Sequence, residues 1–218
     1  MKVHHLGERS SVVNRFIAEL RDAAIQADSM RFRRNIERIS EIFAYEISRE
    51  MDSKMLTVQT PLGIAEVPVP CEELIVASIM RAALPMHQGM LNYFDNAQSA
   101  FISAYRKYGK DNKFTISLEY VSCPNIDDKT VILCDAMLAT GASLELAYRT
   151  LRTRGAPSKM HLVCIVASKD GVEYIKKNLG SHKELSLWTG AIDDELTVKS
   201  YIVPGLGDAG DLAYGDKL

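Results

Sequence analysis

The sequence predicts an α/β fold, in which a central, mostly parallel β-sheet is flanked by helices. The main observation is that short apolar strands alternate with longer helical segments between residues 71 and 192, a pattern typical of parallel strands joined by crossover helices. A proline-containing apolar stretch precedes this region, and a glycine-rich segment follows it. The length of 218 residues also suits a single domain with one core.

We therefore expect one domain over residues 1–218. Its parts are N-terminal helices and a β-arm in 1–70, an α/β core in 71–192 and a C-terminal segment in 193–218. We find no internal repeat, low-complexity tract or interdomain linker in the sequence.

Composition narrows the functional classes. A formal net charge of -2 argues against a surface that neutralises many nucleic-acid phosphates, so a small ligand is expected. The N-terminus lacks the apolar core of a signal peptide, and no apolar run approaches the roughly 20 residues that span a bilayer. The four cysteines form no C-x-x-C pair and are expected to be reduced. These features predict a cytoplasmic protein with no membrane partner.

Two amphipathic helices are expected near the N-terminus. The first follows Ser10 and Ser11, whose hydroxyls can cap it. Its apolar residues recur at helical spacing: Val13, Phe16, Ile17, Leu20 and Ala24. The second carries the apolar stripe Ile36, Ile39, Phe43 and Ile47, and the arginines on its other faces indicate a solvated face or an interface. We expect His4 and His5 to be solvated, because no other metal-ligand type stands near them.

A β-arm and then the core follow. The arm spans residues 55–70, with its reversal at 61–63, and its prolines suit an edge. The expected core elements are strand 74–77, helix 85–93, strands 100–105, 114–120 and 131–135, helix 144–154, strand 160–167, helix 170–178 and strand 185–192. The polar connection 106–113 is a candidate mobile lid. The acidic run 193–195 is interpreted as a solvated turn.

The junction at residues 131–143 is the strongest candidate for an anion site. A buried strand ends at Asp135, and small or hydroxyl residues then lead into a helix, whose N-terminal N–H groups and dipole favour an anion. Thr140 and Ser143 add hydroxyl donors, Gly141 permits close backbone approach, and Asp135 can accept hydrogen bonds from sugar hydroxyls. An ordinary strand–loop–helix turn explains the same composition. Neither the dinucleotide fingerprint nor the Walker pattern is present.

This loop, Asp-Ala-Met-Leu-Ala-Thr-Gly-Ala-Ser, resembles the phosphoribosyl-pyrophosphate loop of uracil phosphoribosyltransferases, whose usual form is Asp-Pro-Met-Leu-Ala-Thr-Gly-Gly-Ser. Seven of nine positions match. Ala136 stands in place of proline and Ala142 in place of glycine. The resemblance implies that phosphoribosyl pyrophosphate (PRPP) binds at Asp135, Ala136, Met137, Leu138, Ala139, Thr140, Gly141, Ala142 and Ser143.

Two arginines extend the resemblance. The segment Ile-Met-Arg-Ala-Ala-Leu-Pro-Met at 79–86 resembles the family's Ile-Leu-Arg-Ala-Gly-Leu-Gly-Met, which implies that Arg81 offers its planar fork of donors to the pyrophosphate. Arg106 follows the expected strand 100–105 and resembles a second pyrophosphate-binding arginine, placed where a lid would exclude water. Without the resemblance, a solvated loop arginine explains Arg81 equally well.

The C-terminal segment carries the third resemblance. Residues 201–211, Tyr-Ile-Val-Pro-Gly-Leu-Gly-Asp-Ala-Gly-Asp, resemble the family's uracil site almost letter for letter. Its glycines and proline force irregular backbone, which leaves N–H and C=O groups free to pair with a base. The resemblance implies that Ile202, Gly207, Asp208 and Ala209 line the uracil site, and that Asp208 also reaches the phosphoribosyl side. By composition alone this is a glycine-rich terminal turn.

The resemblance implies transfer of phosphoribosyl from PRPP to N1 of uracil, which gives UMP and pyrophosphate and serves pyrimidine salvage. Asp208, which would position or deprotonate N1, and Arg106 would be the catalytic residues. Mg²⁺ would bind mainly through PRPP oxygens, without a protein metal cage. A homodimer or higher homo-oligomer is expected, and GTP is a candidate effector.

Two other functions stay open. The first is a pyrimidine-responsive regulator that uses the same fold to bind nucleotide and RNA, and the second is an enzyme for another base.

Overall fold

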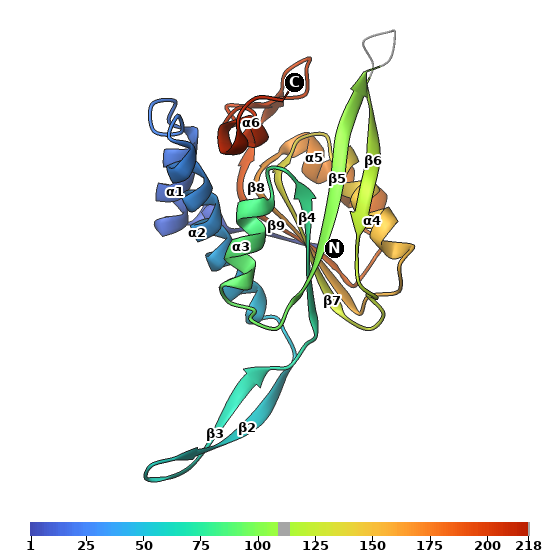
Figure 1. Cartoon of the computed structure of the whole chain (residues 1–218). Helices are drawn as coiled ribbons and strands as arrows, with labels where there is room; N and C mark the ends of the chain where they lie inside the picture. Colours follow the sequence, from blue (N-terminus) through green and yellow to red (C-terminus); the bar gives the residue numbers. More distant parts are fainter. Residues whose placement is uncertain (109–113, 218) are drawn as a thin grey trace.

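The described part of the computed structural model comprises residues 1–108 and 114–217, with side chains described outside 105–118. Its centre is a seven-stranded sheet in the order β1-β9-β8-β7-β4-β5-β6 (Figure 1). The strands in this order are β1 (Lys2–His5), β9 (Leu185–Asp193), β8 (Lys159–Ser168), β7 (Thr130–Leu138), β4 (Leu74–Met80), β5 (Gln98–Tyr108) and β6 (Phe114–Ser122). All neighbours are parallel except β5 and β6. The predicted α/β fold is confirmed.

Helices cover both faces of this sheet (Figure 1). One face packs against α1 (Val12–Arg21), α2 (Ser29–Ser48) and α3 (Leu84–Leu91), and the other against α4 (Ala142–Arg152) and α5 (Lys169–Leu179). Alternate residues of β7 serve the two cores: Ile132 and Cys134 face the first, whereas Val131 and Leu133 face the second. A strand buried on both faces reads as a continuous apolar run, as the sequence of β7 does.

The N-terminal residues form an edge strand that the sequence did not predict. β1 pairs in parallel with β9, and the His4 ring stacks on Trp188 at a centroid distance of 3.6 Å. The expectation that His4 and His5 are solvated is therefore wrong, since both are partly buried. Burial also lowers the pKa of His4 and favours its neutral form.

Several elements extend beyond their expected ends. β5 continues to Tyr108, so that Arg106 lies within the strand, paired with Ile116, and not after it. The cause is the antiparallel ladder with β6, which continues past the apolar stretch. β7 likewise runs to Leu138, because β8 pairs with it that far. Conversely, α1 ends at Arg21, before Ala24. Residues 109–113, which make up most of the expected lid, lie outside the described residues.

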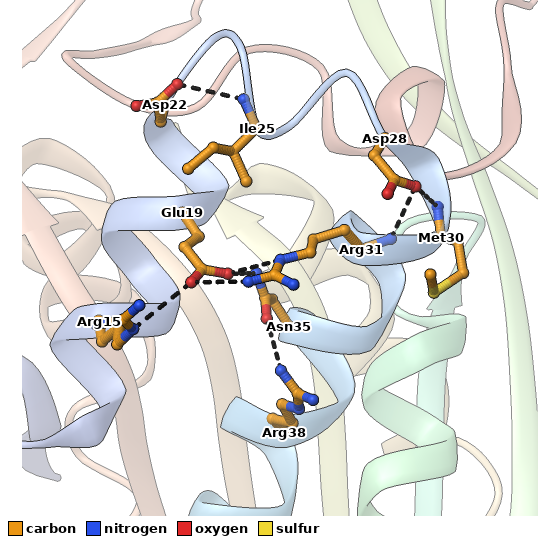
Figure 2. Close-up of polar contacts among 9 residues, drawn as sticks. All are labelled: Arg15, Glu19, Asp22, Ile25, Asp28, Met30, Arg31, Asn35 and Arg38. Atoms are coloured by element: carbon orange, nitrogen blue, oxygen red, sulfur yellow. Dashed lines mark hydrogen bonds and ion pairs between the residues drawn. The ribbon is translucent and has the colours of Figure 1, made fainter.

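Some of the arginines of α2 contact other parts of the chain, and Arg31 joins α2 to α1. Figure 2 shows Arg31 and Asn35 of α2 donating to Glu19 of α1, whose side chain is 10 % exposed. The Asp28 side chain caps α2 and fixes the turn between the helices. This contact, internal to the chain, holds the end of α1 against the body of the molecule.

The β-arm is confirmed as β2 (Ser53–Thr60) paired with β3 (Gly63–Pro70). It projects away from the sheet (Figure 1). Its exposed apolar residues are Met55, Leu56, Val58, Leu62, Ile64 and Val67. The arm therefore presents apolar surface that the chain itself does not cover.

The remaining elements are short. They are the 3₁₀ helix η1 (Leu6–Glu8), the paired strands β10 (Glu195–Leu196) and β11 (Ile202–Val203), and α6 (Ala209–Tyr214). The C-terminal segment, residues 194–217, lies over the end of the sheet beside α2 (Figure 1). Within the described residues, no helix combines the length and apolar character needed to cross a membrane.

Candidate active site

A cavity of about 860 Å³ lies where β4 and β7 end, beside Ser103 and Ala104 of β5, and the C-terminal segment covers it. The parallel register explains this convergence, because Met80 of β4 pairs with Ser103 of β5, and Ser78 pairs with Cys134 of β7. Ligands of open α/β sheets bind at the carboxyl ends of strands. The cavity wall includes these predicted site residues: Arg81, Asp135, Met137, Leu138, Ala139, Thr140, Gly141, Ser143, Ile202, Gly207, Asp208 and Ala209.

Two predicted residues are not among those lining the cavity. Ala136 is only 1 % exposed and packs in the core on the α2 side of the sheet, because alternate residues of β7 face opposite ways. Ala142 is the first residue of α4. The side chain of Arg106 lies outside the described residues.

The start of α4 forms one wall. Gly141 precedes the helix with φ of 86°, and a Cβ there would lie 2.6 Å from Cδ1 of Tyr174. The left-handed conformation therefore falls on Gly141 and not on Ala142, which explains how alanine is accommodated at 142. The first N–H groups of a helix have no partner within it, and Ser143 and Leu144 of this turn line the cavity. The wall thus suits an anion.

Arg81 connects the loop after β4 to the C-terminal segment. Its Nη2 donates to Oδ1 of Asp211 at 2.8 Å and to the carbonyl oxygen of Gly215 at 3.0 Å. The guanidinium is 35 % exposed and retains other N–H groups that a ligand could use. The residue predicted to meet pyrophosphate therefore also anchors the segment predicted to bind the base.

Asp208 is held by several cationic or N–H donors. Its Oδ1 accepts from the N–H groups of Gly210 and Asp211 at 2.9 and 3.1 Å, and Lys217 Nζ lies 3.2 Å from Oδ2. Burial alone would raise the pKa of Asp208, but these donors together lower it below its ordinary value. Asp208 is consequently ionised near neutral pH.

Sequence reasoning missed Asp193, which it placed in a solvated acidic turn. That expectation is wrong for Asp193, which is 7 % exposed. Both its oxygens accept hydrogen bonds from Arg21 at 2.7 Å, and Oδ2 also accepts from the N–H of Gly205 at 2.9 Å. Its neighbour Asp194 is exposed, as expected. No local pattern marks the difference, because the partners of Asp193 come from distant parts of the chain.

Two other functional candidates were also missed. Lys217 lines the cavity beside Asp208, and the only sequence signal is a cation shortly after the glycine-rich motif. Arg33 of α2 donates to the carbonyl oxygen of Ala213 at 2.6 Å and lies over the ring of Tyr214. Arg21, Arg33 and Arg81 thus each donate to a backbone carbonyl of the C-terminal segment.

Comparison with known proteins agrees with this geometry. The family model described as uracil phosphoribosyltransferase matches residues 8–216. A uracil phosphoribosyltransferase from Porphyromonas gingivalis is 52 % identical over 218 residues, which cover 100 % of both chains. A uracil phosphoribosyltransferase from Pyrococcus furiosus is 34 % identical over 212 residues, which cover 96 % of this chain and 88 % of the relative.

Solved structures agree on the fold. A protein from Aquifex aeolicus superposes with a TM-score of 0.85 at 26 % identity, over 99 % of each chain. A hypoxanthine phosphoribosyltransferase from Staphylococcus aureus reaches 0.51 at 12 % identity, over 75 % of this chain and 76 % of that one, and bears on the fold alone. The full-length match to the family model and the 52 % identity decide the assignment. This chain belongs to the uracil phosphoribosyltransferase family.

Proposed function

We propose that this protein transfers the phosphoribosyl group of PRPP to N1 of uracil and releases UMP and pyrophosphate, a step of pyrimidine salvage. The observation that carries the proposal is a single cavity lined both by the residue 135–143 loop and by the residue 202–211 segment. One wall suits a phosphorylated sugar, and the other offers irregular backbone to a base. The relatives, which are named as uracil phosphoribosyltransferases, give no support to a regulator without catalysis.

The phosphoribosyl half is proposed to use the wall formed by β7 and α4. The N–H groups at the start of α4 and the hydroxyls of Thr140 and Ser143 would bind the phosphate, with Asp135 accepting from the ribose hydroxyls. The backbone of residues 136–142 would lie along the bound phosphoribosyl group. Arg81 and Arg106 would neutralise the pyrophosphate. The role of Arg106 rests on the resemblance and on its position in β5.

Mg²⁺ is proposed as the accompanying ion. The described residues contain no group of three or more His, Cys, Asp or Glu side chains that could hold a metal. The carboxylates of Asp135 and Asp208 do line the cavity, and one or two carboxylates together with substrate phosphates are a common environment for Mg²⁺. When bound, the ion would neutralise charge on the departing pyrophosphate.

The uracil half is proposed to use Ile202, Gly207, Asp208 and Ala209. Ile202 is 5 % exposed and supplies apolar contact, while the irregular backbone at Gly207 offers hydrogen-bonding groups to the base. The transition state would resemble an oxocarbenium ion, so that the protein must mainly align the reactants, stabilise the leaving group and exclude water. We assign Asp208 a positioning role, because a carboxylate with a lowered pKa is a weak proton acceptor.

We further propose that copies of the chain associate through the β-arm, as a dimer or a higher oligomer. A two-stranded hairpin is marginally stable alone, and this arm exposes apolar side chains along its length.

The N-terminal part, the α/β core and the C-terminal segment are proposed to form one domain. Two contacts support this, since β1 joins the sheet of the core and the C-terminal segment closes the cavity. A cytoplasmic location stays a prediction.

The activity itself is the first test. Purified protein incubated with labelled uracil, PRPP and Mg²⁺ is expected to form UMP, detected by chromatography, and to lose the activity when Mg²⁺ is chelated. Hypoxanthine in place of uracil serves as the control for another base. Absence of UMP would refute the proposed function, and salt-sensitive RNA binding without UMP would favour the regulator. GTP added to the same assay tests the effector, which stimulation of the rate would support.

The phosphate wall gives a second prediction. Gly141→Ala is expected to raise the KM for PRPP about tenfold or more, because a left-handed alanine costs about 1–2 kcal/mol and its Cβ would collide with Tyr174. Ala142→Gly, which introduces the family's usual residue, is the matched control and should change this KM by less than about twofold, since position 142 does not require a positive φ. A large effect at 142 with none at 141 would contradict the assignment.

Asp208 gives a third prediction. Asp208→Asn keeps an oxygen that can cap α6 but loses the charge that pairs with Lys217, and kcat should fall by less than about tenfold. Loss of a proton-transfer group would instead lower kcat by about 10²–10⁴, which would show that Asp208 acts as a base despite its lowered pKa. Asp216→Asn, at an exposed neighbouring position, is the control and should leave kcat unchanged.

The β-arm gives a fourth prediction. A variant with Leu62→Asp and Ile64→Asp, at the exposed tip of the arm, is expected to shift the protein to monomer in sedimentation or light-scattering measurements, because charges oppose burial of the tip. Val198→Asp, at another fully exposed apolar position, is the control. A wild-type protein that is monomeric at micromolar concentrations would rule out the proposed association.

A further inference from the structure

We propose that Arg21 and Asp193 are positioning residues for the base half of the active site. They hold the backbone at Gly205, and three of the four residues proposed to meet uracil, Gly207, Asp208 and Ala209, begin two positions later. Neither side chain is part of the cavity wall, so any influence on uracil would act through the C-terminal segment. The inference rests on the proposed function and adds residues that determine how the base is bound.

The contacts form a closed set around one residue, Gly205. Both Nη atoms of Arg21 donate to Asp193, at 2.7 Å each. Nη1 of Arg21 also donates to the carbonyl oxygen of Gly205 at 3.0 Å, and the N–H of Gly205 donates to Oδ2 of Asp193 at 2.9 Å. The donor and the acceptor of this glycine are therefore each paired with a charged group, which makes stronger hydrogen bonds than a neutral partner.

The backbone at this point has little freedom to move. Gly205 has φ of 56°, and a Cβ there would lie 2.1 Å from the carbonyl oxygen of Ile202. The neighbouring side chains of Ile202 and Leu206 are 5 % and 3 % exposed. A glycine whose N–H and C=O are both held by charged groups, with buried side chains beside it, defines the direction in which the chain continues to Gly207 and Asp208.

The Arg21–Asp193 pair, which anchors Gly205, is itself held in place by other elements. Asp193 is the last residue of β9, in the central sheet. Arg21 is the last residue of α1, which Glu19 ties to Arg31 of α2 (Figure 2). A buried carboxylate requires a paired cation, so that Arg21 and Asp193 hold each other as well as the glycine. These contacts therefore fix the position of the C-terminal segment relative to both the sheet and the helices α1 and α2.

The position of the anchor along the chain indicates its effect. Residues 207–209 lie between Gly205, held by Arg21 and Asp193, and Ala213, held by Arg33. The phosphoribosyl half is formed instead by β7 and α4, where neither Arg21 nor Asp193 makes a hydrogen bond in the described structure. Loosening the anchor should consequently weaken uracil binding more than PRPP binding.

The test compares Asp193→Asn with Asp194→Asn, its exposed neighbour, which pairs with Lys169 at the surface. In Asp193→Asn one oxygen becomes an NH₂ group that faces N–H donors. The loss of a charge-assisted hydrogen bond is expected to raise the KM for uracil about tenfold or more. The KM for PRPP should change by less than about threefold. Asp194→Asn should leave both KM values unchanged. Arg21→Lys should raise the KM for uracil, but by less than Asp193→Asn does.

Several outcomes would overturn the inference. A folded Asp193→Asn protein whose two KM values match the wild type, with only a lower melting temperature, would assign the pair to stability alone, and equal increases in both KM values would also refute a base-specific role. If the variants do not fold, hydrogen exchange of the wild-type protein tests whether the backbone at Gly205 is held. The Gly205 amide should be protected at least as well as strand amides of β9, and exchange at the rate of an exposed loop would refute the anchor. Lack of UMP formation by the wild type would refute the proposed function instead.

Discussion

The parallel pairing of β4 with β5 on one side and with β7 on the other determines where everything else in the site can lie. Because the strands pair in parallel register, Met80, the last residue of β4, lies beside Ser103 of β5. Asp135 follows Cys134, the partner of Ser78, toward the same carboxyl end of the sheet. The loop that carries Arg81 and the helix start at Ala142 therefore open into one cavity. β4 and β7 are each buried on both faces, so that the positions of the loops that follow them are set by two cores rather than by the loops themselves.

The C-terminal segment closes that cavity with only short regular elements, β10, β11 and α6, joined by irregular backbone. Backbone groups can be offered to a ligand only if the rest of the segment is held by other contacts. Here Arg21, Arg33 and Arg81, from α1, α2 and the β4–α3 loop, donate to its carbonyl groups. Arg81 also belongs to the loop proposed to meet pyrophosphate, so that the two substrate halves share a residue and are positioned relative to each other.

The charges around Asp208 support the proposed role in alignment over a role in proton transfer. Asp208 caps α6 and pairs with Lys217, and these donors outweigh the effect of burial on its pKa. On the opposite wall, the left-handed Gly141 allows α4 to begin at Ala142 and present its N-terminus to the cavity. The proposed substrate, which carries its own leaving group and would bring Mg²⁺, would mainly require such fixed donors and acceptors.

The sequence by itself determined the α/β fold class, the β-arm, the loop at residues 135–143 and the C-terminal segment, because strand and helix periodicity, turn residues and contiguous motifs are all local signals. The tertiary structure alone decided that residues 2–5 form an edge strand, that Ala136 faces the core, and that Asp193 is buried while Asp194 is exposed. The physical reason is sequence distance. Arg21 and Asp193 are 172 residues apart, and β1 finds its partner in β9 at the far end of the core, so that neither partner is visible until the sheet has formed.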